Sequence, residues 1–393
     1  MKKASRRDFL RNSLAGGAAI AITPALISKE TADRSRFTND FRSKREDEWR
    51  NRVESMHYRR FGNTGLMLSE LVMGTFGRNK IPVAREAIER GVNYFDVAQR
   101  YARGRNEEAI GEIVSEAGMR DRIFISTKIS AYLPTIDALA KDVINGLPSE
   151  KLHAIRKRSL KTLDNAGVQR TGYHFDLFPG HDQELPEGYL TSQIVREFGH
   201  HPNFKNELRK KMDQAVDGSL RRLKTDYVDV LHCPHGARLP EELEEPTIRE
   251  FYEDAKKSGK VRFAGVSVHS DVPSILNRAA ELSYYDVAMV AYNIANQGTM
   301  ELAITRAAEQ GMGLIAMKAA RAINREIDGR PVPSWRLDKL NQAISGDEKA
   351  ELKAYVWALQ NSNITSVISH IDNSDMLREN LAVCGRRVDL GIV

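Results

Sequence analysis

The chain has 393 residues, of which 41% are hydrophobic and 28% are charged, and this length is sufficient to bury the core of one large domain. Its two cysteines, Cys233 and Cys384, exclude a disulfide framework and a cysteine-rich zinc or iron–sulfur site. Residues 1–55 hold 13 Lys and Arg against 8 Asp and Glu and so carry +5 of the net charge of +6, and the nearly neutral remainder argues against a nucleic-acid-binding surface.

The N-terminal region has the pattern of a targeting segment. Within residues 1–28, the stretch "SRRDFL" resembles the twin-arginine export signal, which predicts that the twin-arginine machinery exports the folded protein to the periplasm or cell envelope. A disordered basic tail is the alternative. The apolar stretch that follows is rich in Gly and Ala and is interrupted by Pro24, so we expect no stable membrane span. Residues 29–56 are highly charged and are predicted to form a linker with a helical stretch.

From residue 57 to residue 393 the pattern becomes regular. The stretch "YRRFGNTGLML" predicts a hairpin around Asn63-Thr64-Gly65. Short apolar runs that are typical of buried strands follow at 70–76, 92–98, 123–129, 227–233, 261–268, 287–293, 313–319 and 366–371. Amphipathic helical patterns lie between them, at 82–91, 106–118, 206–224, 240–259, 299–311 and 347–362. Several of these patterns end in Gly, the usual C-terminal cap of a helix.

About eight strand–helix units predict a closed (β/α)₈ TIM barrel with an N-terminal hairpin. A doubly wound open sheet is the rival fold, but no G-x-G-x-x-G motif follows the first strand. The spacing breaks after the third strand, where residues 131–204 separate it from the next helix. A structureless connection of this length is improbable in a compact domain, so we expect a partly helical insertion or lid over the C-terminal face of the barrel.

Polar residues end several of the predicted strands. Asp96 ends the second strand with Tyr101 just after it, Lys128 ends the third, and His232 or His235 follows the fourth. In a barrel these ends converge. An ammonium group held by a carboxylate stabilises a nearby phenolate, and this makes tyrosine a usable general acid for a carbonyl oxygen that receives hydride. Separate roles, with Asp96 as a cap, Tyr101 as packing and Lys128 as a solvated strand end, are the simpler alternative.

An ordered series of segments resembles the aldo-keto reductase family across roughly residues 57–385, apart from the insertion. The segments are "YRRFGNTGLMLSELVMGT", "GVNYFDVAQRYARGRNEEAIGE", "IFISTK", "SLRRLKTDYVDVLH", "KKSGKVRFAGVSVHS", "GLIAMK" and "SVISHIDNSDMLRENLAV". The resemblance implies a (β/α)₈ barrel that reduces a small-molecule carbonyl substrate with NADPH, or with NADH. It maps the family's catalytic tetrad to Asp96, Tyr101, Lys128 and a histidine after the fourth strand. We favour His235, which needs a one-residue bulge near Pro234, over His232, which lies one layer deeper.

The resemblance is less complete for the cofactor. It implies contacts from Gly74, Thr75, Ser267 and Lys318 at strand ends, and from Glu379 and Asn380 at the adenine side. Met289 and Met317 stand where the family has a glutamine and an aromatic residue, so they are candidate cofactor contacts, with barrel packing as the alternative. Val268 replaces the asparagine that usually follows Ser267. His370 and Met376 replace the basic residues expected near a 2′-phosphate, although Arg378 is adjacent.

Histidines in the insertion raise one further question. His174, His181, His200 and His201 could form a metal site, but loop and surface positions are the favoured interpretation, and no metal is expected. Two other functions stay open beside the carbonyl oxidoreductase. One is a lyase or isomerase that uses Tyr101 and Lys128 for proton transfer, and the other is a non-catalytic binding protein on the same barrel.

Overall fold

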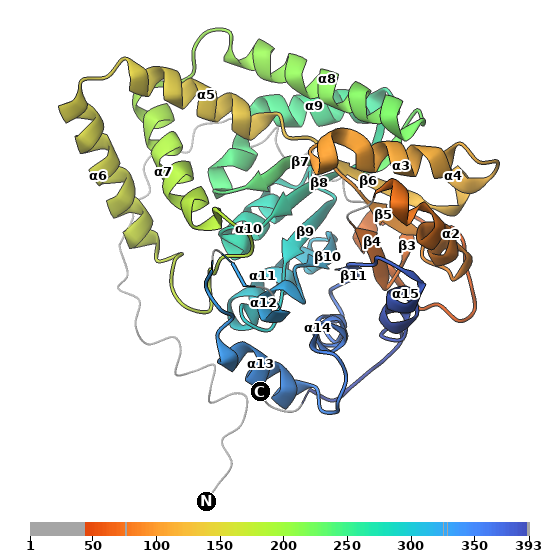
Figure 1. Ribbon diagram of the computed structural model, residues 1–393. Coiled ribbons are helices and arrows are strands. Elements are labelled where there is room, and N and C mark those ends of the chain that lie inside the picture. The colour runs from red at the N-terminus through yellow and green to blue at the C-terminus, as the bar shows by residue number, and fades with distance from the viewer. Residues whose placement is uncertain (1–43, 75–76, 325, 328, 391–393) are drawn as a thin grey trace, which may run out of the picture. The chain divides into compact units, whose positions relative to one another are not determined.

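The computed structural model describes residues 44–74, 77–324, 326–327 and 329–390. Eight parallel strands form a closed barrel in the order β10-β11-β4-β5-β6-β7-β8-β9 (Figure 1). Their bounds are β4 Leu71–Gly74, β5 Tyr94–Asp96, β6 Phe124–Lys128, β7 Val228–Ala237, β8 Val261–Val268, β9 Val287–Ala291, β10 Gly313–Met317 and β11 Ser366–Ser369. The eight predicted strands and the closed barrel are therefore confirmed.

Helices connect the strands. They are α2 Ile81–Glu89, α3 Arg105–Val114, α4 Met119–Arg122, α8 Phe204–Leu223, α9 Pro246–Lys257, α10 Val272–Leu282, α11 Gln297–Glu309, α12 Arg321–Asn324, α13 Ser334–Ala343, α14 Ala350–Leu359 and α15 Ser374–Leu381, with the 3₁₀ turns η4 Arg78–Lys80, η5 Tyr101–Gly104 and η6 Pro240–Glu244. The pattern at 240–259 predicts one helix, but Pro246 divides it into η6 and α9. Proline favours the first turn of a helix, where its missing N–H is not needed.

The predicted hairpin forms below the barrel. β2 (Tyr58–Arg60) pairs antiparallel with β3 (Leu66–Ser69) around η3 (Gly62–Thr64), and Gly65 adopts the left-handed conformation that glycine tolerates best. Apolar side chains of this hairpin extend into the lumen. Phe61 packs there with Tyr94, Phe124 and other strand residues in one buried cluster. The lumen of the barrel is therefore a packed core at this end.

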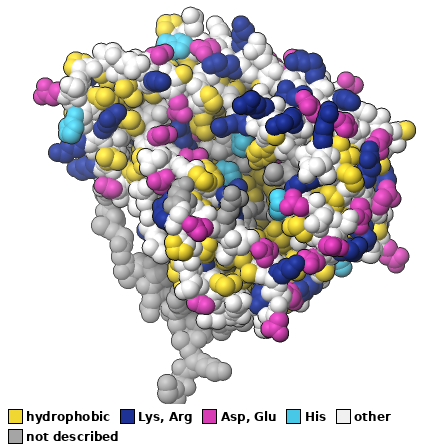
Figure 2. Space-filling model, in the orientation of Figure 1, with side chains coloured by type: hydrophobic (Ala, Val, Ile, Leu, Met, Phe, Trp, Pro, Cys, Tyr) yellow, Lys and Arg dark blue, Asp and Glu magenta, His cyan; other side chains and the backbone are white. Residues whose placement is uncertain are grey.

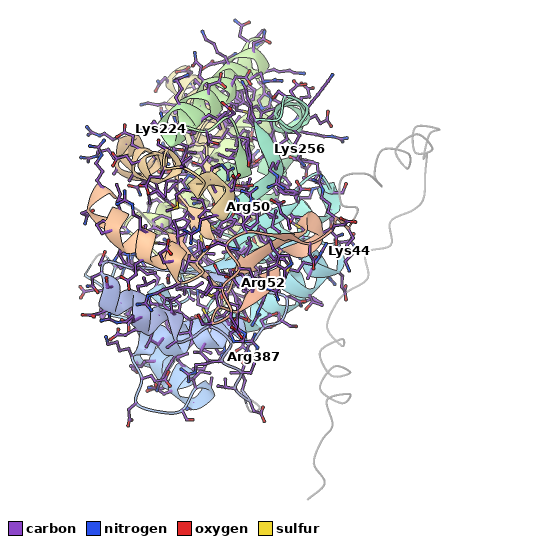
Figure 3. All side chains as sticks on the ribbon, turned by 90° about the vertical axis from the view of Figure 1, so that its right-hand side faces the viewer. Lys44, Arg50, Arg52, Lys224, Lys256 and Arg387 are labelled. Atoms are coloured by element: carbon purple, nitrogen blue, oxygen red, sulfur yellow. The ribbon has the colours of Figure 1, made fainter. Side chains whose placement is uncertain are left out.

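The charged segment before the hairpin differs from the predicted linker. Its described part, residues 44–56, contributes β1 (Glu48–Trp49), which pairs parallel with β3 and makes the hairpin a three-stranded sheet. Arg50, labelled in Figure 3, donates to the Ile123 carbonyl at 2.8 Å and stacks on Phe124 with its guanidinium carbon 4.5 Å from the ring centroid. Glu48 forms ion pairs with Arg50 and Arg262. These contacts hold the segment against the barrel, so the linker prediction is wrong for residues 44–56.

The insertion after β6 is helical, as expected. It contains α5 (Tyr132–Asn145), α6 (Ser149–Ala166) and α7 (His181–Phe198), and α7 packs on both α5 and α6. Leu163 and Leu185 share a small apolar cluster with Leu239, which follows β7. The insertion is thereby joined to the barrel through its own apolar core. Among the described residues, no helix combines the length and apolarity needed to cross a bilayer.

Candidate active site

A buried ion pair lies at the C-terminal ends of β5 and β6. Lys128 Nζ contacts Asp96 Oδ2, and the two side chains are 1% and 4% exposed. Ser126 donates to the other carboxylate oxygen at 2.6 Å, and Lys128 also donates to the Val97 carbonyl at 3.2 Å. Buried charges are costly unless they are paired and hydrogen-bonded, as these are. Asp96 therefore fixes the position of the ammonium group.

Tyr101 lies over this ammonium group. Lys128 Nζ is 5.1 Å from the centroid of the Tyr101 ring. Burial lowers the pKa of Lys128, but the charge of Asp96 and the Tyr101 phenol outweigh it, so the net pKa is raised and the side chain stays charged. After Tyr101 the chain turns sharply, because Ala102 and Arg103 adopt positive φ angles of 49° and 57°. The turn belongs to η5 and leads directly into α3.

His235 reaches the same place through a bulge in β7. His232 pairs with Gly265 and His235 pairs with Ser267, so β7 contains one residue more than β8 between these pairs. The predicted bulge at Pro234 is thereby confirmed. The His235 ring lies 6.1 Å from the Tyr101 ring, centroid to centroid, and its Nδ1 is 3.0 Å from Ser130 Oγ.

The imidazole of His235 is neutral. Burial lowers its pKa to about 3, and the positive charges of Lys128, Arg100 and Lys318 act in the same direction. His232 is fully buried within the barrel and its Nδ1 faces the Val266 carbonyl at 3.2 Å. The structure therefore brings together Asp96, Tyr101, Lys128 and His235, and it places His232 one strand pair deeper.

Buried polar atoms without partners mark the strand ends beside this group. Within the described chain, Ser267 Oγ, His269 Nδ1, Asn293 Nδ2 and Ser369 Oγ are buried and have no hydrogen-bond partner. Unsatisfied buried polar atoms are rare and each calls for an explanation. A polar ligand that lies across the ends of β8, β9 and β11 would satisfy them. The sequence motifs indicate Ser267, but Asn293 and His269 were missed: Asn293 lies in no quoted family segment, and His269 lies inside "KKSGKVRFAGVSVHS" but was not singled out.

Two adjoining cavities continue from these strand ends. The first, about 320 Å³, is lined by Lys318, Arg321, Ser369 and others, and the second, about 440 Å³, by Lys349, Met376, Glu379 and Asn380 among others. They share Asn324, Tyr355 and His370. The space-filling view shows a hollow near the middle of this face, with histidine side chains around it (Figure 2).

The predicted adenine-side residues meet at the second cavity. Asn380 is buried and donates to the His370 carbonyl at 3.0 Å, which fixes its position. Glu379 forms an ion pair with Lys349 at 2.6 Å. Lys349 is a third residue that sequence reasoning missed, since it precedes α14 and lies outside the family-like segments. Arg378 pairs with Asp375 on α15.

The two candidate methionines lie in the barrel core. Met289 and Met317 belong to the apolar cluster in the lumen, together with Phe61 and Ile315. This packing agrees with the alternative interpretation, and their contact with a cofactor stays a prediction. Gly74 ends β4, where a Cβ atom would lie 2.5 Å from the Ile368 side chain. Thr75 lies outside the described residues.

Two of the four insertion histidines come together. One ligand atom from each of His174, Asp176 and His181 lies within 4.8 Å of the others. However, His181 Nδ1 accepts from the Leu177 amide at 3.1 Å, and its Nε2 faces Ser270 Oγ at 2.8 Å. Both ring nitrogens are therefore engaged, and metal binding would require one of these hydrogen bonds to break. His200 and His201 lie elsewhere, beside Phe204.

The segment that precedes α7 is tied to the ends of β8 and β10. Tyr173 donates to Asp271, Arg321 donates to the Leu177 carbonyl, and the Phe178 ring lies 5.4 Å from the His269 ring. Lys318 Nζ is 5.9 Å from the centroid of the Phe178 ring. Residues 173–178 thus connect the insertion to the strand ends that carry the unpartnered polar atoms.

Comparisons with known proteins agree with this geometry. The family model described as "Aldo/keto reductase family" matches residues 75–176 and 193–323. An uncharacterized oxidoreductase of Bacillus subtilis, YqkF, is 23% identical over 352 residues, which cover 84% of this chain and 92% of that protein. A probable voltage-gated potassium channel subunit beta of Arabidopsis thaliana is 43% identical over 188 residues, and the match covers 45% of this chain and 37% of that protein.

Solved structures share the fold. The holo form of aldo-keto reductase AKR11C1 from Bacillus halodurans aligns with a TM-score of 0.55 and 20% identity, over 84% of this chain and 90% of that chain. An aldo-keto reductase from Klebsiella pneumoniae in complex with NADPH aligns with a TM-score of 0.53 and 18% identity, over 85% of this chain and 91% of that chain. Because the family model covers more than half of the chain, the protein belongs to the aldo/keto reductase family of enzymes.

Proposed function

We propose that the protein is an oxidoreductase that transfers hydride between a nicotinamide dinucleotide, NADP in the first instance, and a carbonyl or alcohol substrate. The observation that carries the proposal is the buried Lys128–Asp96 pair, whose ammonium group lies under the Tyr101 ring beside a neutral His235. This is the arrangement that proton transfer to a carbonyl oxygen requires. Family membership and the NADPH complex of the Klebsiella pneumoniae relative support the choice of cofactor.

The residues at the strand ends fit a dinucleotide. Ser267 Oγ, Asn293 Nδ2 and Ser369 Oγ are buried and unpartnered, as polar groups that await a ligand would be. Lys318 and Arg321 line the adjoining cavity and can face phosphates, while Glu379 and Asn380 line the cavity beyond it. When bound, the nicotinamide supplies hydride to the carbonyl carbon.

The chain's own residues supply the proton. Tyr101 gives its phenolic proton to the carbonyl oxygen as the carbon receives hydride, so that the product is the alcohol. Lys128 stabilises the phenolate that forms, and Asp96 holds Lys128 in place. With Nδ1 directed to Ser130, neutral His235 can orient the carbonyl oxygen with its remaining nitrogen. Oxidation of an alcohol uses the same groups in reverse.

Replacing Tyr101 with Phe tests the proposal, because it removes the proton and keeps the ring. We expect turnover of carbonyl substrates to fall by about 10²–10⁴-fold, the usual contribution of general acid catalysis. NADPH affinity, measured by fluorescence titration, should change little. Tyr227, which is half-buried just before β7, gives a matched control: Tyr227→Phe should leave both quantities unchanged.

Two outcomes would contradict the proposal. Full turnover in Tyr101→Phe would remove Tyr101 from the reaction. Failure of both NADPH and NADH to bind saturably to the unmodified protein would contradict the proposed oxidoreductase activity. It would favour a proton-transfer lyase or isomerase, or a non-catalytic binding protein, on the same barrel.

We further propose that the protein reaches the periplasm or cell envelope through the twin-arginine route. The support lies in the sequence alone, in the Arg6-Arg7 pair of "SRRDFL" and the mildly apolar stretch after it, and these residues lie outside the described part of the structure. This route carries folded proteins, so a dinucleotide would be loaded before export.

A further inference from the structure

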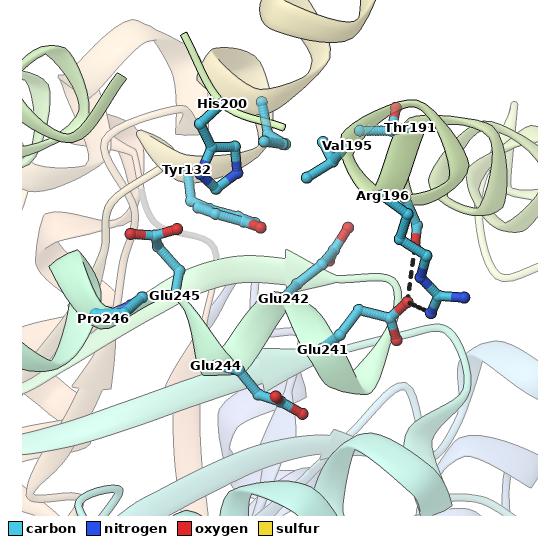
Figure 4. Close-up of a pocket in the computed structure, with 12 residues that line it drawn as sticks. Tyr132, Thr191, Val195, Arg196, His200, Glu241, Glu242, Glu244, Glu245 and Pro246 are labelled. Carbon is cyan, nitrogen blue, oxygen red and sulfur yellow. Dashed lines mark hydrogen bonds and ion pairs between the residues drawn. The ribbon is translucent and has the colours of Figure 1, made fainter. Parts of the chain in front are cut away.

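A cavity of about 300 Å³ lies between the insertion and the segment after β7 (Figure 4). α5 contributes Tyr132 and Ile136, α7 contributes Val195 and its neighbours, and η6 with the residues after it contributes four glutamates. No residue of this lining belongs to the Tyr101 group or to the two dinucleotide cavities. The family model also leaves out residues 177–192, which include part of the α7 wall. The cavity therefore lies partly on a segment that the family model does not match.

The phenol of Tyr132 projects into this cavity, as Figure 4 shows. The residue is 7% exposed, and its hydroxyl has no hydrogen-bond partner among the described residues. Burial, together with the charges of Glu242, Glu245 and Glu241, raises the pKa of Tyr132 well above its usual value. The hydroxyl therefore stays protonated beside carboxylates, and its oxygen is available to accept a hydrogen bond. Because the hydroxyl lines the cavity, a ligand with a donor can reach it and form a hydrogen bond.

The carboxylates differ in how they are neutralised. Glu241 pairs with Arg196 at 2.8 Å, Glu242 with Arg238 at 3.1 Å, and Glu244 with Arg278 at 2.9 Å. Glu245 accepts from the amide and hydroxyl of Thr247, at 3.1 and 2.6 Å, and has no cation among its described partners. The cavity thus has a net negative charge, centred on Glu245. Ile136, Val195 and Pro246 give the cavity an apolar part, and Thr191, Ser192 and His200 complete its lining.

We propose that this cavity binds a small organic ammonium ion. The ammonium N–H groups donate to the Glu245 carboxylate and to the Tyr132 hydroxyl, and the apolar body of the ligand packs on Ile136 and Val195. A cation of this kind supplies the donor that Tyr132 lacks and the charge that Glu245 lacks. An inorganic cation would leave the apolar walls uncovered, and a neutral apolar compound would leave both polar groups unsatisfied. The site does not depend on the reaction at Tyr101.

Calorimetric titration of the full-length protein with benzylammonium tests this site, with benzyl alcohol as the neutral analogue of similar shape. We expect benzylammonium to bind saturably, and benzyl alcohol at least about tenfold more weakly, because a hydrogen bond to a charged group contributes more than a neutral one. Glu245→Gln keeps an acceptor for Thr247 and removes the charge, so it should weaken benzylammonium by about tenfold or more. Tyr132→Phe should weaken it by about two- to tenfold.

Glu253→Gln is the matched control, because Glu253 lies on the exposed side of α9 in an ion pair with Arg249. It should leave benzylammonium affinity unchanged. Equal binding of benzylammonium and benzyl alcohol would overturn the proposal, as would an absence of saturable binding. Equal affinity in the Glu245→Gln, Tyr132→Phe and unmodified proteins would also overturn it. Tyr132→Phe disrupts no described hydrogen bond, so it remains decisive even if Glu245→Gln weakens the start of α9.

Discussion

The imidazoles of His181 and His235 are both held neutral inside the protein. Burial lowers each pKa to about 3, and neighbouring positive groups, among them Lys318 for both, add to the effect. In the unfolded chain the same side chains take up a proton near pH 6.5. The unfolded state therefore binds more protons than the folded state below about pH 6.5, so folded stability is present above that pH and is lost as the pH falls toward about 3. Glu184, whose pKa burial raises to about 7, acts in the opposite direction.

His235→Gln should make this loss of stability shallower. The amide cannot take up a proton, so between pH 6.5 and 5.5 the fall in the free energy of unfolding should shrink by up to about 1.4 kcal/mol. Urea denaturation at pH 7.5, 6.5 and 5.5 measures the difference. His200→Gln, at an exposed position beside Phe204, should leave the slope unchanged. Equal slopes for the two variants would show that His235 does not contribute to acid sensitivity.

Residues that end strands could be predicted from the sequence, while residues that meet through loops could not. Asp96 and Lys128 each close an apolar run, so the convergence of strand ends in a barrel is enough to pair them. Phe178 and His269 lie on different segments of the chain, and their rings approach to 5.4 Å only because residues 173–178 follow one particular path. No periodic pattern encodes such a path. Lys349 escaped prediction for the same reason, whereas Asn293 ends the predicted strand 287–293 and was not singled out.

At the scale of elements, the close contact between the hairpin and the barrel requires a glycine at position 313. Phe61, directly after β2, packs so closely on β10 that a Cβ atom on Gly313 would lie 2.3 Å from its ring. The sequence indicates the hairpin through Asn63-Thr64-Gly65, but it does not indicate that β1 joins it. β1 is two residues long, and its pairing depends on Arg50 and Glu48 contacts with distant strands. Elements this short carry no periodic signal.

Gly313→Ala should therefore destabilise the protein. The added methyl group displaces the fully buried Phe61 ring, and overpacking of this kind costs about 1–3 kcal/mol. Gly298→Ala is the matched control, because that glycine lies exposed in α11 and an added Cβ atom would meet nothing within 4 Å. It should be neutral or should stabilise by up to about 1 kcal/mol. Thermal denaturation of both variants gives the comparison, and equal melting temperatures would contradict the close packing.

At the scale of the whole molecule, the chain combines a barrel with a helical insertion after β6 and a basic N-terminal region. Strand runs and their order predict the barrel, because each buried parallel strand reads as a continuous apolar segment. The insertion adds α5, α6 and α7, and with them the cavity under Tyr132. A partly helical insertion could be expected from the length of the connection. The packing of its helices on the segment after β7 depends on tertiary contacts such as that of Leu185 with Leu239.

At this scale we predict that export through the twin-arginine route depends on Arg6 and Arg7. The route's receptor reads a pair of guanidinium groups, and lysine presents a compact ammonium group of different geometry. Replacing Arg6 and Arg7 together with Lys keeps the charge, so a change in location cannot come from electrostatic attraction alone. We expect this variant to accumulate in the cytoplasm, while the unmodified protein reaches the periplasm or envelope. Cell fractionation with an antibody to the barrel measures both.

A second pair of substitutions separates the signal from the basic character of the region. Arg34 and Arg36 lie in the charged segment downstream, and replacing them with Lys changes the same number of guanidinium groups outside the motif. This variant should be exported like the unmodified protein. Equal export of both double variants would show that the export machinery does not recognise the Arg6-Arg7 pair. The basic N-terminal region would then not act as a twin-arginine signal. Retention of both would instead point to the overall guanidinium content of residues 1–55, and the twin-arginine motif would again lose its role.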